Sequence, residues 1–182
     1  MPRGNTFATF IDGDLELMSH CPLHEELKHV LTLLVYAAAR ATGISLKPMG
    51  NVTLREPTAG PGFEPDECFY RNARRGQFNG LTPEQMPPPD LAVEVEVSRD
   101  VLGRLPAFAV KGVAEVWRCD GEEGLRFMRL SDGEYREVPA SRLLPGVTPE
   151  MVWGAATTLP DLDDAIDYQL AAAEFFTDRL GD

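Results

Sequence analysis

The sequence lacks any apolar run that approaches the roughly 20 residues needed to cross a membrane. Its first residues, Met1-Pro2-Arg3-Gly4-Asn5, have no apolar segment of the kind found in secretory signals. Cysteine is scarce, and Cys21, Cys68 and Cys119 show neither a CxxC motif nor the Cys/His spacing of a metal site. We therefore expect a cytoplasmic protein with reduced thiols and no membrane partner.

Positively charged residues are also few relative to negatively charged ones. The chain has 17 Lys and Arg against 29 Asp and Glu, a net charge of −12, which argues against a strongly basic surface for nucleic acid. Half of this excess falls in residues 161–182, which we expect to form the solvated face of a helix. One small basic cluster, Arg71, Arg74 and Arg75, could contact phosphates, although a solvated loop explains it more simply.

Length and composition are those of an ordinary globular protein. With 182 residues, 43% of them apolar and 25% charged, the chain suits one domain spanning residues 1–182. We find no internal repeat, low-complexity tract or interdomain linker in it.

Hydrophobic periodicity predicts strands interrupted by helices, hence an α/β fold with a mixed sheet flanked by helices. The expected strands span residues 7–17 (a hairpin), 44–55 (where Pro48-Met49-Gly50 could introduce a bend), 66–71, 91–97, 115–119, 125–130 and 134–138. The expected helices span residues 22–42, 102–111 and about 160–180. In the last helix, the side chains expected to pack against the core are Ile166, Leu170, Ala173 and Phe176. Residues 72–89 form a long loop of the kind that is often functional or mobile.

The strand over Leu91–Val97 carries the most informative side chains. Residues two apart share one face of a strand, so Glu94 and Glu96 lie together, with Asp90 four residues earlier on the same face. The remaining residues are apolar, which predicts a buried strand. Buried carboxylates are costly unless they are paired or bound to metal. We interpret Glu94 as a ligand of a divalent cation, with a buried Arg104–Glu94 ion pair as the alternative.

A second carboxylate can join Glu94. Asp66 follows Pro65 at the start of another predicted strand, 28 residues before Glu94. A chain reversal through the intervening loop could place the two strands side by side. Asp66 and Glu94 would then hold Mg²⁺ or Mn²⁺, which prefer oxygen ligands. Such an ion acidifies water and stabilises charge on a phosphoryl oxygen.

Several motifs together resemble a known family. In order, they are Gly13–Ser19, His24-Glu25, Glu64–Tyr70, Pro89–Val95 and Gly112–Arg118. Each is weak alone, but their order over most of the chain is similar to the Uma-type putative restriction endonucleases, within the PD-(D/E)XK nuclease superfamily. The resemblance implies a restriction-endonuclease-like mixed sheet and a Mg²⁺-dependent endonuclease acting on DNA.

The resemblance also implies roles for individual residues. Asp66 would be the aspartate of the first motif and Glu94 the acid of the second, both catalytic and both metal ligands. Glu25, in the His-Glu pair, would be an additional ligand. The position expected to hold lysine is Glu96, and in this family the lysine appears in the following helix instead. Arg104 stands at that position in this sequence.

This arginine matters because it keeps the positive charge and can clamp a phosphate, but it does not readily lose a proton. Lys111, two helical turns further on, would have to act over about 10 Å, so we do not expect it to substitute.

Three functions therefore stay open. The first is a metal-dependent endonuclease in which Asp66 and Glu94 hold the ion and Arg104 clamps a phosphate. The second is an inactive nuclease fold used for binding, with Arg104 neutralising Glu94. The third is a metal-dependent hydrolase of small phosphate esters, since the acidic chain makes long DNA an awkward partner. Cutting both strands would favour a homodimer, but the sequence leaves the oligomeric state open.

Overall fold

The chain is described here from a computed structural model, in residues 6–11, 14–19, 21–56, 62–97, 104–121, 124–159 and 164–181. Gly13, Leu102, Gly103 and the predicted helix start at 160–163 lie outside these described residues. In the described part of the chain, no helix is both long and apolar enough to cross a bilayer.

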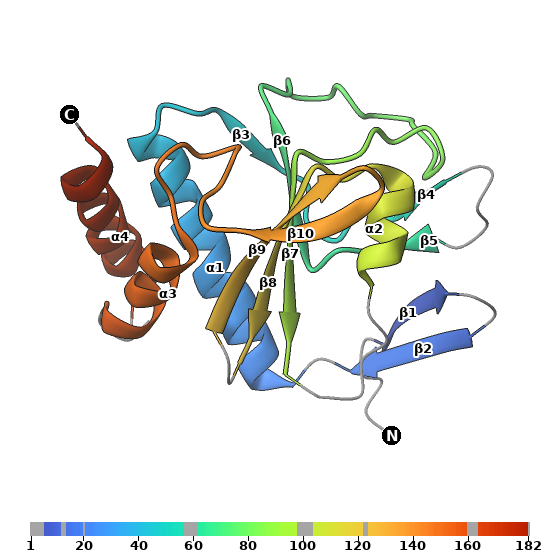
Figure 1. Ribbon diagram of the computed structural model, residues 1–182, viewed down its shortest axis with the longest axis horizontal. Helices are drawn as coiled ribbons and strands as arrows, with labels where there is room; N and C mark the ends of the chain where they lie inside the picture. Colours follow the sequence, from blue (N-terminus) through green and yellow to red (C-terminus); the bar gives the residue numbers. More distant parts are fainter. Residues whose placement is uncertain are drawn as a thin grey trace.

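A six-stranded mixed sheet forms the centre of the molecule, in the order β10-β9-β8-β7-β6-β3 (Figure 1). Its strands are β3 (Leu46–Pro48), β6 (Glu67–Arg71), β7 (Leu91–Glu96), β8 (Glu115–Asp120), β9 (Gly124–Ser131) and β10 (Glu134–Val138). Strands β7 and β8 are parallel and every other neighbouring pair is antiparallel. Two small sheets pair β1 (Thr6–Ile11) with β2 (Asp14–Ser19) and β4 (Leu54–Arg55) with β5 (Gly62–Phe63).

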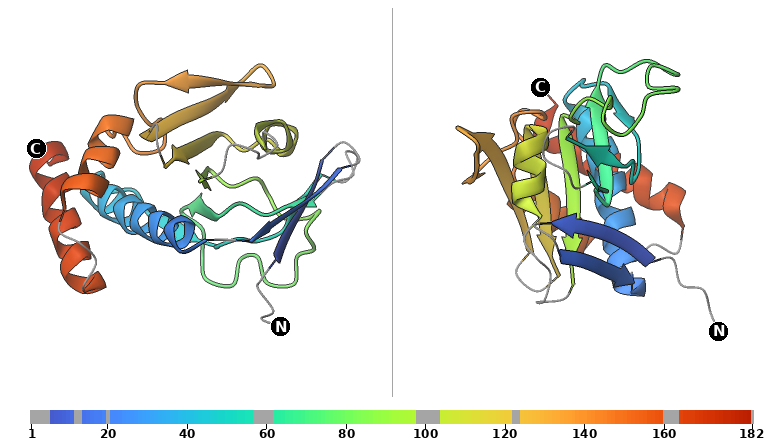
Figure 2. Two further views of the ribbon diagram at one scale, coloured as in Figure 1. Left: turned by 90° about the horizontal axis from the view of Figure 1, so that it is seen from below. Right: turned by 90° about the vertical axis from the view of Figure 1, so that its right-hand side faces the viewer.

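Helices cover both faces of this sheet. The helices are α1 (Pro22–Ala41), α2 (Leu105–Lys111), α3 (Pro149–Thr158) and α4 (Ala165–Leu180). Figure 1 shows α1, α3 and α4 together on one side and α2 on the other, and Figure 2 shows the β1–β2 hairpin at the end remote from α3 and α4. The predicted mixed sheet flanked by helices is therefore confirmed.

Alternation along β7 explains how its two faces are filled. Leu91, Val93 and Val95 pack in the larger core with α1, α3 and α4. Ala92 lies in a second core on the α2 side, and Glu94 points to that same face because it is two residues further on. A strand buried on both faces reads as a nearly continuous apolar run, so its single buried carboxylate stands out in the sequence.

Three local predictions were wrong or incomplete. Residues 44–55 form two separate strands, β3 and β4, and Gly50, in the segment where a bend was considered, has φ 62°. Helix α3 was not predicted, although Thr148 accepts a hydrogen bond from the backbone N–H of Met151 and caps it. In α4, Phe176 is buried as expected, but Ile166 and Leu170 are exposed. The buried face of α4 carries Tyr168, Ala172 and Phe176. The predicted packing face of this helix was therefore partly wrong.

Candidate active site

Asp66 and Glu94 meet at the junction of β6 and β7. The pairing of Glu67 with Val93 brings Asp66, just before β6, beside Glu94. The backbone N–H of Asp66 donates to Glu94 Oε1 at 3.1 Å, and the backbone N–H of Val95 donates to Asp66 Oδ2 at 2.8 Å. Both carboxylates are buried, at 6% exposure for Asp66 and 4% for Glu94. The antiparallel pairing thus brings together the two acids that the sequence singled out.

Arg104 supplies a buried positive charge to this pair. It is the N-cap residue of α2, is 5% exposed, and donates from Nη1 to Glu94 Oε2 at 3.0 Å. Burial and the neighbouring Asp66 carboxylate nevertheless raise the pKa of Glu94, and Arg104 only partly opposes the rise. The raised pKa of Glu94 indicates that the two neighbouring carboxylates disfavour one another's charged form, which favours a site able to accept further positive charge.

His24 is the fourth buried polar residue here. It lies in the first turn of α1, is 2% exposed, and its Nε2 lies 3.1 Å from Asp66 Oδ2. Burial lowers the pKa of His24, but the carboxylates of Asp66 and Glu25 outweigh this effect and raise the pKa above its ordinary value. A histidine held in this way fixes the orientation of the Asp66 carboxylate.

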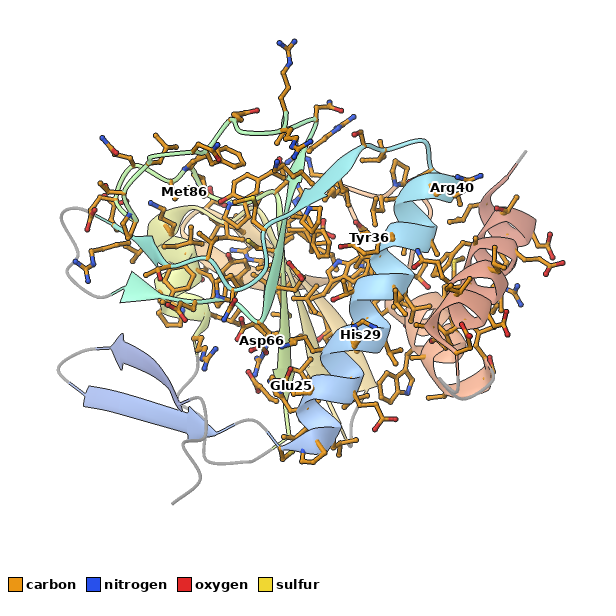
Figure 3. All side chains as sticks on the ribbon, turned by 180° about the vertical axis from the view of Figure 1, so that it is seen from behind. Glu25, His29, Tyr36, Arg40, Asp66 and Met86 are labelled. Carbon is orange, nitrogen blue, oxygen red and sulfur yellow. The ribbon has the colours of Figure 1, made fainter. Side chains whose placement is uncertain are left out.

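Glu25 lies on the other side of the His24 ring. Its Oε1 is 3.4 Å from His24 Nδ1, its Oε2 is 2.6 Å from Lys28 Nζ, and its side chain is 46% exposed. Figure 3 shows Asp66 and Glu25 near the N-terminal turns of α1. The predicted role of Glu25 as a metal ligand stays a prediction, because the contact that connects it to Asp66 runs through His24.

The other charged residues considered from the sequence have their own partners. Glu96 accepts two hydrogen bonds from Arg118, at 3.2 Å from Nε and 2.5 Å from Nη2, and is about one-fifth exposed. Lys111 donates to the backbone carbonyl of Arg55 at 2.7 Å. Asp90 accepts from the backbone N–H of Arg71 at 2.7 Å. The hydrogen bonds of Glu96, Lys111 and Asp90 thus hold these residues to neighbours other than Asp66 and Glu94.

The donor set fits a hard divalent cation. Among the described residues there is no cluster of three or more His, Cys, Asp or Glu arranged to hold a metal ion. Magnesium does not need one, because proteins usually bind it through one or two carboxylates together with waters and substrate phosphates. Two buried carboxylates, each accepting a backbone hydrogen bond across the β6–β7 junction, match that requirement.

His24 was not among the site residues predicted from the sequence, although its ring contacts Asp66 in the structure. The signal was present, since His24 belongs to the same motif as Glu25 and opens α1 just after Pro22.

The chain is similar to known proteins in sequence family and in fold. A family model described as a putative restriction endonuclease matches residues 2–160. Among solved structures, the chain is similar to a putative nuclease belonging to DUF820 from Anabaena variabilis, with a TM-score of 0.57 and 11% identity. That match covers 85% of this chain and 93% of the other, and at this identity it shows the shared fold. No curated protein matches the chain.

Proposed function

Because this chain belongs to the family of putative restriction endonucleases, we propose that it is a Mg²⁺- or Mn²⁺-dependent endonuclease acting on DNA. Asp66 and Glu94 would hold the ion through their carboxylates, with Glu25 as a more distant candidate ligand. The observation that carries the proposal is the hydrogen-bonded, buried Asp66–Glu94 pair, in which the buried Arg104 contacts the Glu94 carboxylate.

Each residue has a separate task in this proposal. When bound, a divalent ion supplies an acidified water and stabilises negative charge on the phosphoryl oxygen. The backbone N–H of Val95 and the ring of His24 fix the Asp66 carboxylate, so that it is oriented before substrate arrives. Burial of both acids excludes bulk water and strengthens electrostatic interactions within the site.

Arg104 would act in two states. Without metal, it neutralises Glu94 through the 3.0 Å hydrogen bond. With metal bound, Glu94 no longer needs this partner, and the guanidinium is available to clamp a phosphate oxygen of DNA. Because arginine stays protonated, we assign it to phosphate binding and not to removing a proton from water.

A plasmid-nicking assay tests this function. Wild type should convert supercoiled DNA to nicked or linear DNA when Mg²⁺ or Mn²⁺ is added, and Glu94→Ala should abolish the conversion. The matched control is Glu96→Ala, which removes another carboxylate of β7 that pairs with Arg118. Glu96→Ala should retain activity, and loss in both variants would point to damage of the strand instead.

The Arg104–Glu94 ion pair also favours a second candidate, an inactive nuclease fold that binds a partner. In that case Arg104→Lys, which restores the family's residue type, would give nicking activity that wild type lacks. Activity in wild type that equals or exceeds that of Arg104→Lys would exclude this candidate.

Two further proposals concern the setting of the protein. Its three cysteines are all free, which supports a reducing compartment such as the cytoplasm.

Cleavage of both DNA strands would need two active sites, so we propose a homodimer on DNA. Sedimentation of the protein with and without a short duplex would test that state.

A further inference from the structure

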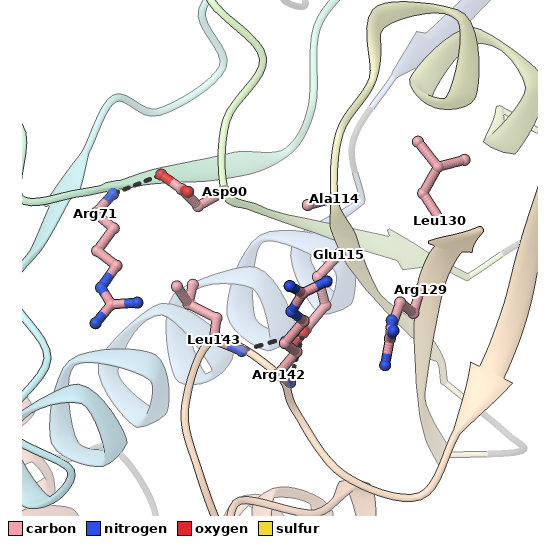
Figure 4. A pocket seen from close by; sticks show the side chains of 8 residues that line it. All are labelled: Arg71, Asp90, Ala114, Glu115, Arg129, Leu130, Arg142 and Leu143. Atoms are coloured by element: carbon pink, nitrogen blue, oxygen red, sulfur yellow. Dashed lines mark hydrogen bonds between the residues drawn. The ribbon is translucent and has the colours of Figure 1, made fainter. Parts of the chain in front are cut away.

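A pocket lined by three arginines lies away from the carboxylate pair. It has a volume of about 310 Å³ and is found where β7 and β8 begin. Arg71 ends β6, Arg129 lies in β9, and Arg142 belongs to the loop before α3. Figure 4 shows Arg129 and Arg142 on one side of this arginine pocket and Arg71 on the other.

This pocket is separate from the proposed active site. Asp90, which lines the pocket, lies just before β7 and four residues before Glu94. Four residues span about 13 Å along an extended strand. Glu115 and Arg129 are directly paired across β8 and β9 and share the sheet face of Trp117 and the larger core. Glu94 points to the opposite face.

The two carboxylates in the pocket are already held by other donors. Asp90 accepts from a backbone N–H at 2.7 Å. Glu115 is 2% exposed and accepts from Trp117 Nε1 at 2.7 Å, from Ser141 Oγ at 2.6 Å and from the backbone N–H of Arg142 at 2.8 Å. Glu115 therefore fixes the loop that presents Arg142, so the position of this arginine is built into the fold.

The three guanidinium groups have no such partners. Within the described part of the chain, none of Arg71, Arg129 and Arg142 forms an ion pair through its side chain, and all three are exposed. With Asp90 and Glu115 counted, the pocket carries a net charge of +1 in a chain whose net charge is −12. A positive concave site on an acidic protein selects a compact anion over a long one.

We propose that the arginine pocket binds the phosphate group of a small phosphorylated molecule, such as a mononucleotide. Guanidinium forks match phosphate oxygens in pairs, and three arginines from separate segments line this one pocket. The volume lies at the lower end of the range for small-molecule sites, which suits a ligand of this size. This proposal is independent of the nuclease function, because none of its residues contacts Asp66 or Glu94.

Calorimetric titration with dAMP, in EDTA to keep metal from recruiting phosphate to the carboxylates, tests the proposal. Wild type should bind dAMP, and Arg129→Ala and Arg142→Ala should each weaken binding about tenfold, the usual effect of losing a charge-assisted hydrogen bond. Arg40→Ala, which removes an exposed arginine of α1 outside the pocket, should leave binding unchanged. Unaltered melting temperatures would show that all three variants are folded.

Three further ligands distinguish binding of a small phosphorylated molecule from binding of DNA. Deoxyadenosine, which has no phosphate, should not bind, and inorganic phosphate should compete with dAMP. Binding of a 5′-phosphorylated oligonucleotide without binding of dAMP would overturn the proposal and assign the pocket to DNA. Absence of binding at millimolar dAMP, or equal binding by wild type and both pocket variants, would also overturn it.

Discussion

Replacing Arg104 by alanine should expose how the two buried acids are balanced. The change removes the guanidinium that donates to Glu94 Oε2 at 3.0 Å and leaves a buried carboxylate beside Asp66. Breaking a buried ion pair by removing one partner costs about 3–5 kcal/mol. For a chain of this length, 1 kcal/mol shifts the melting temperature by about 2–4 °C, so we expect a fall of roughly 6–20 °C.

The size of this fall should depend on pH, because protonation can replace the lost cation. Glu94 already has a raised pKa, and removing Arg104 raises it further. At about pH 6 a proton neutralises Glu94 and the loss should be near its lower limit, whereas at about pH 9 it should approach the upper limit. Adding Mn²⁺ should restore more stability to Arg104→Ala than to wild type, since the ion no longer competes with the guanidinium.

Thermal unfolding followed by circular dichroism, with and without Mn²⁺, measures both effects. Arg118→Ala is the matched control, because it breaks the partly exposed pair with Glu96 and should cost only about 0–1 kcal/mol. The reasoning fails if Arg104→Ala and Arg118→Ala lose the same stability, or if Mn²⁺ stabilises Arg104→Ala no more than wild type.

Four other substitutions test the account. In metal-free buffer, the raised pKa of Glu94 means that the folded state binds this proton more tightly, so the free energy of unfolding should fall as pH rises above the ordinary value near 4.5. Glu94→Gln should flatten this fall, and an unchanged profile would contradict the assignment. His24→Ala should weaken Mn²⁺ binding about 10- to 100-fold through lost orientation of Asp66, measured by titration. Phe176→Ala should destabilise by about 3–5 kcal/mol in urea unfolding, whereas truncating the exposed Ile166 should change stability by less than about 0.5 kcal/mol.

The sequence was most informative where burial and chemistry conflict. Glu94 could be identified because a carboxylate inside an apolar strand needs a partner, and the structure supplies Arg104 and Asp66. The central sheet could be predicted for a different reason. Alternation of apolar residues and turn residues are local patterns, which the sequence shows directly.

The remaining errors arose where tertiary contacts decide the outcome. In α4, Ile166 and Leu170 share helical spacing with Phe176, yet the neighbouring helix α1 packs on the side of Tyr168 and Phe176. The arginine pocket could not be predicted either, because Arg71 and Arg142 are 71 positions apart and meet only through the sheet.

The most direct test of the central claim is calorimetric titration of Mn²⁺ into wild type and Glu94→Ala in metal-free buffer. The account predicts binding to wild type with release of a proton from Glu94, and loss of binding in Glu94→Ala. Equal binding by both proteins, or no binding to wild type even with a short DNA duplex present, would contradict a metal site at Asp66 and Glu94.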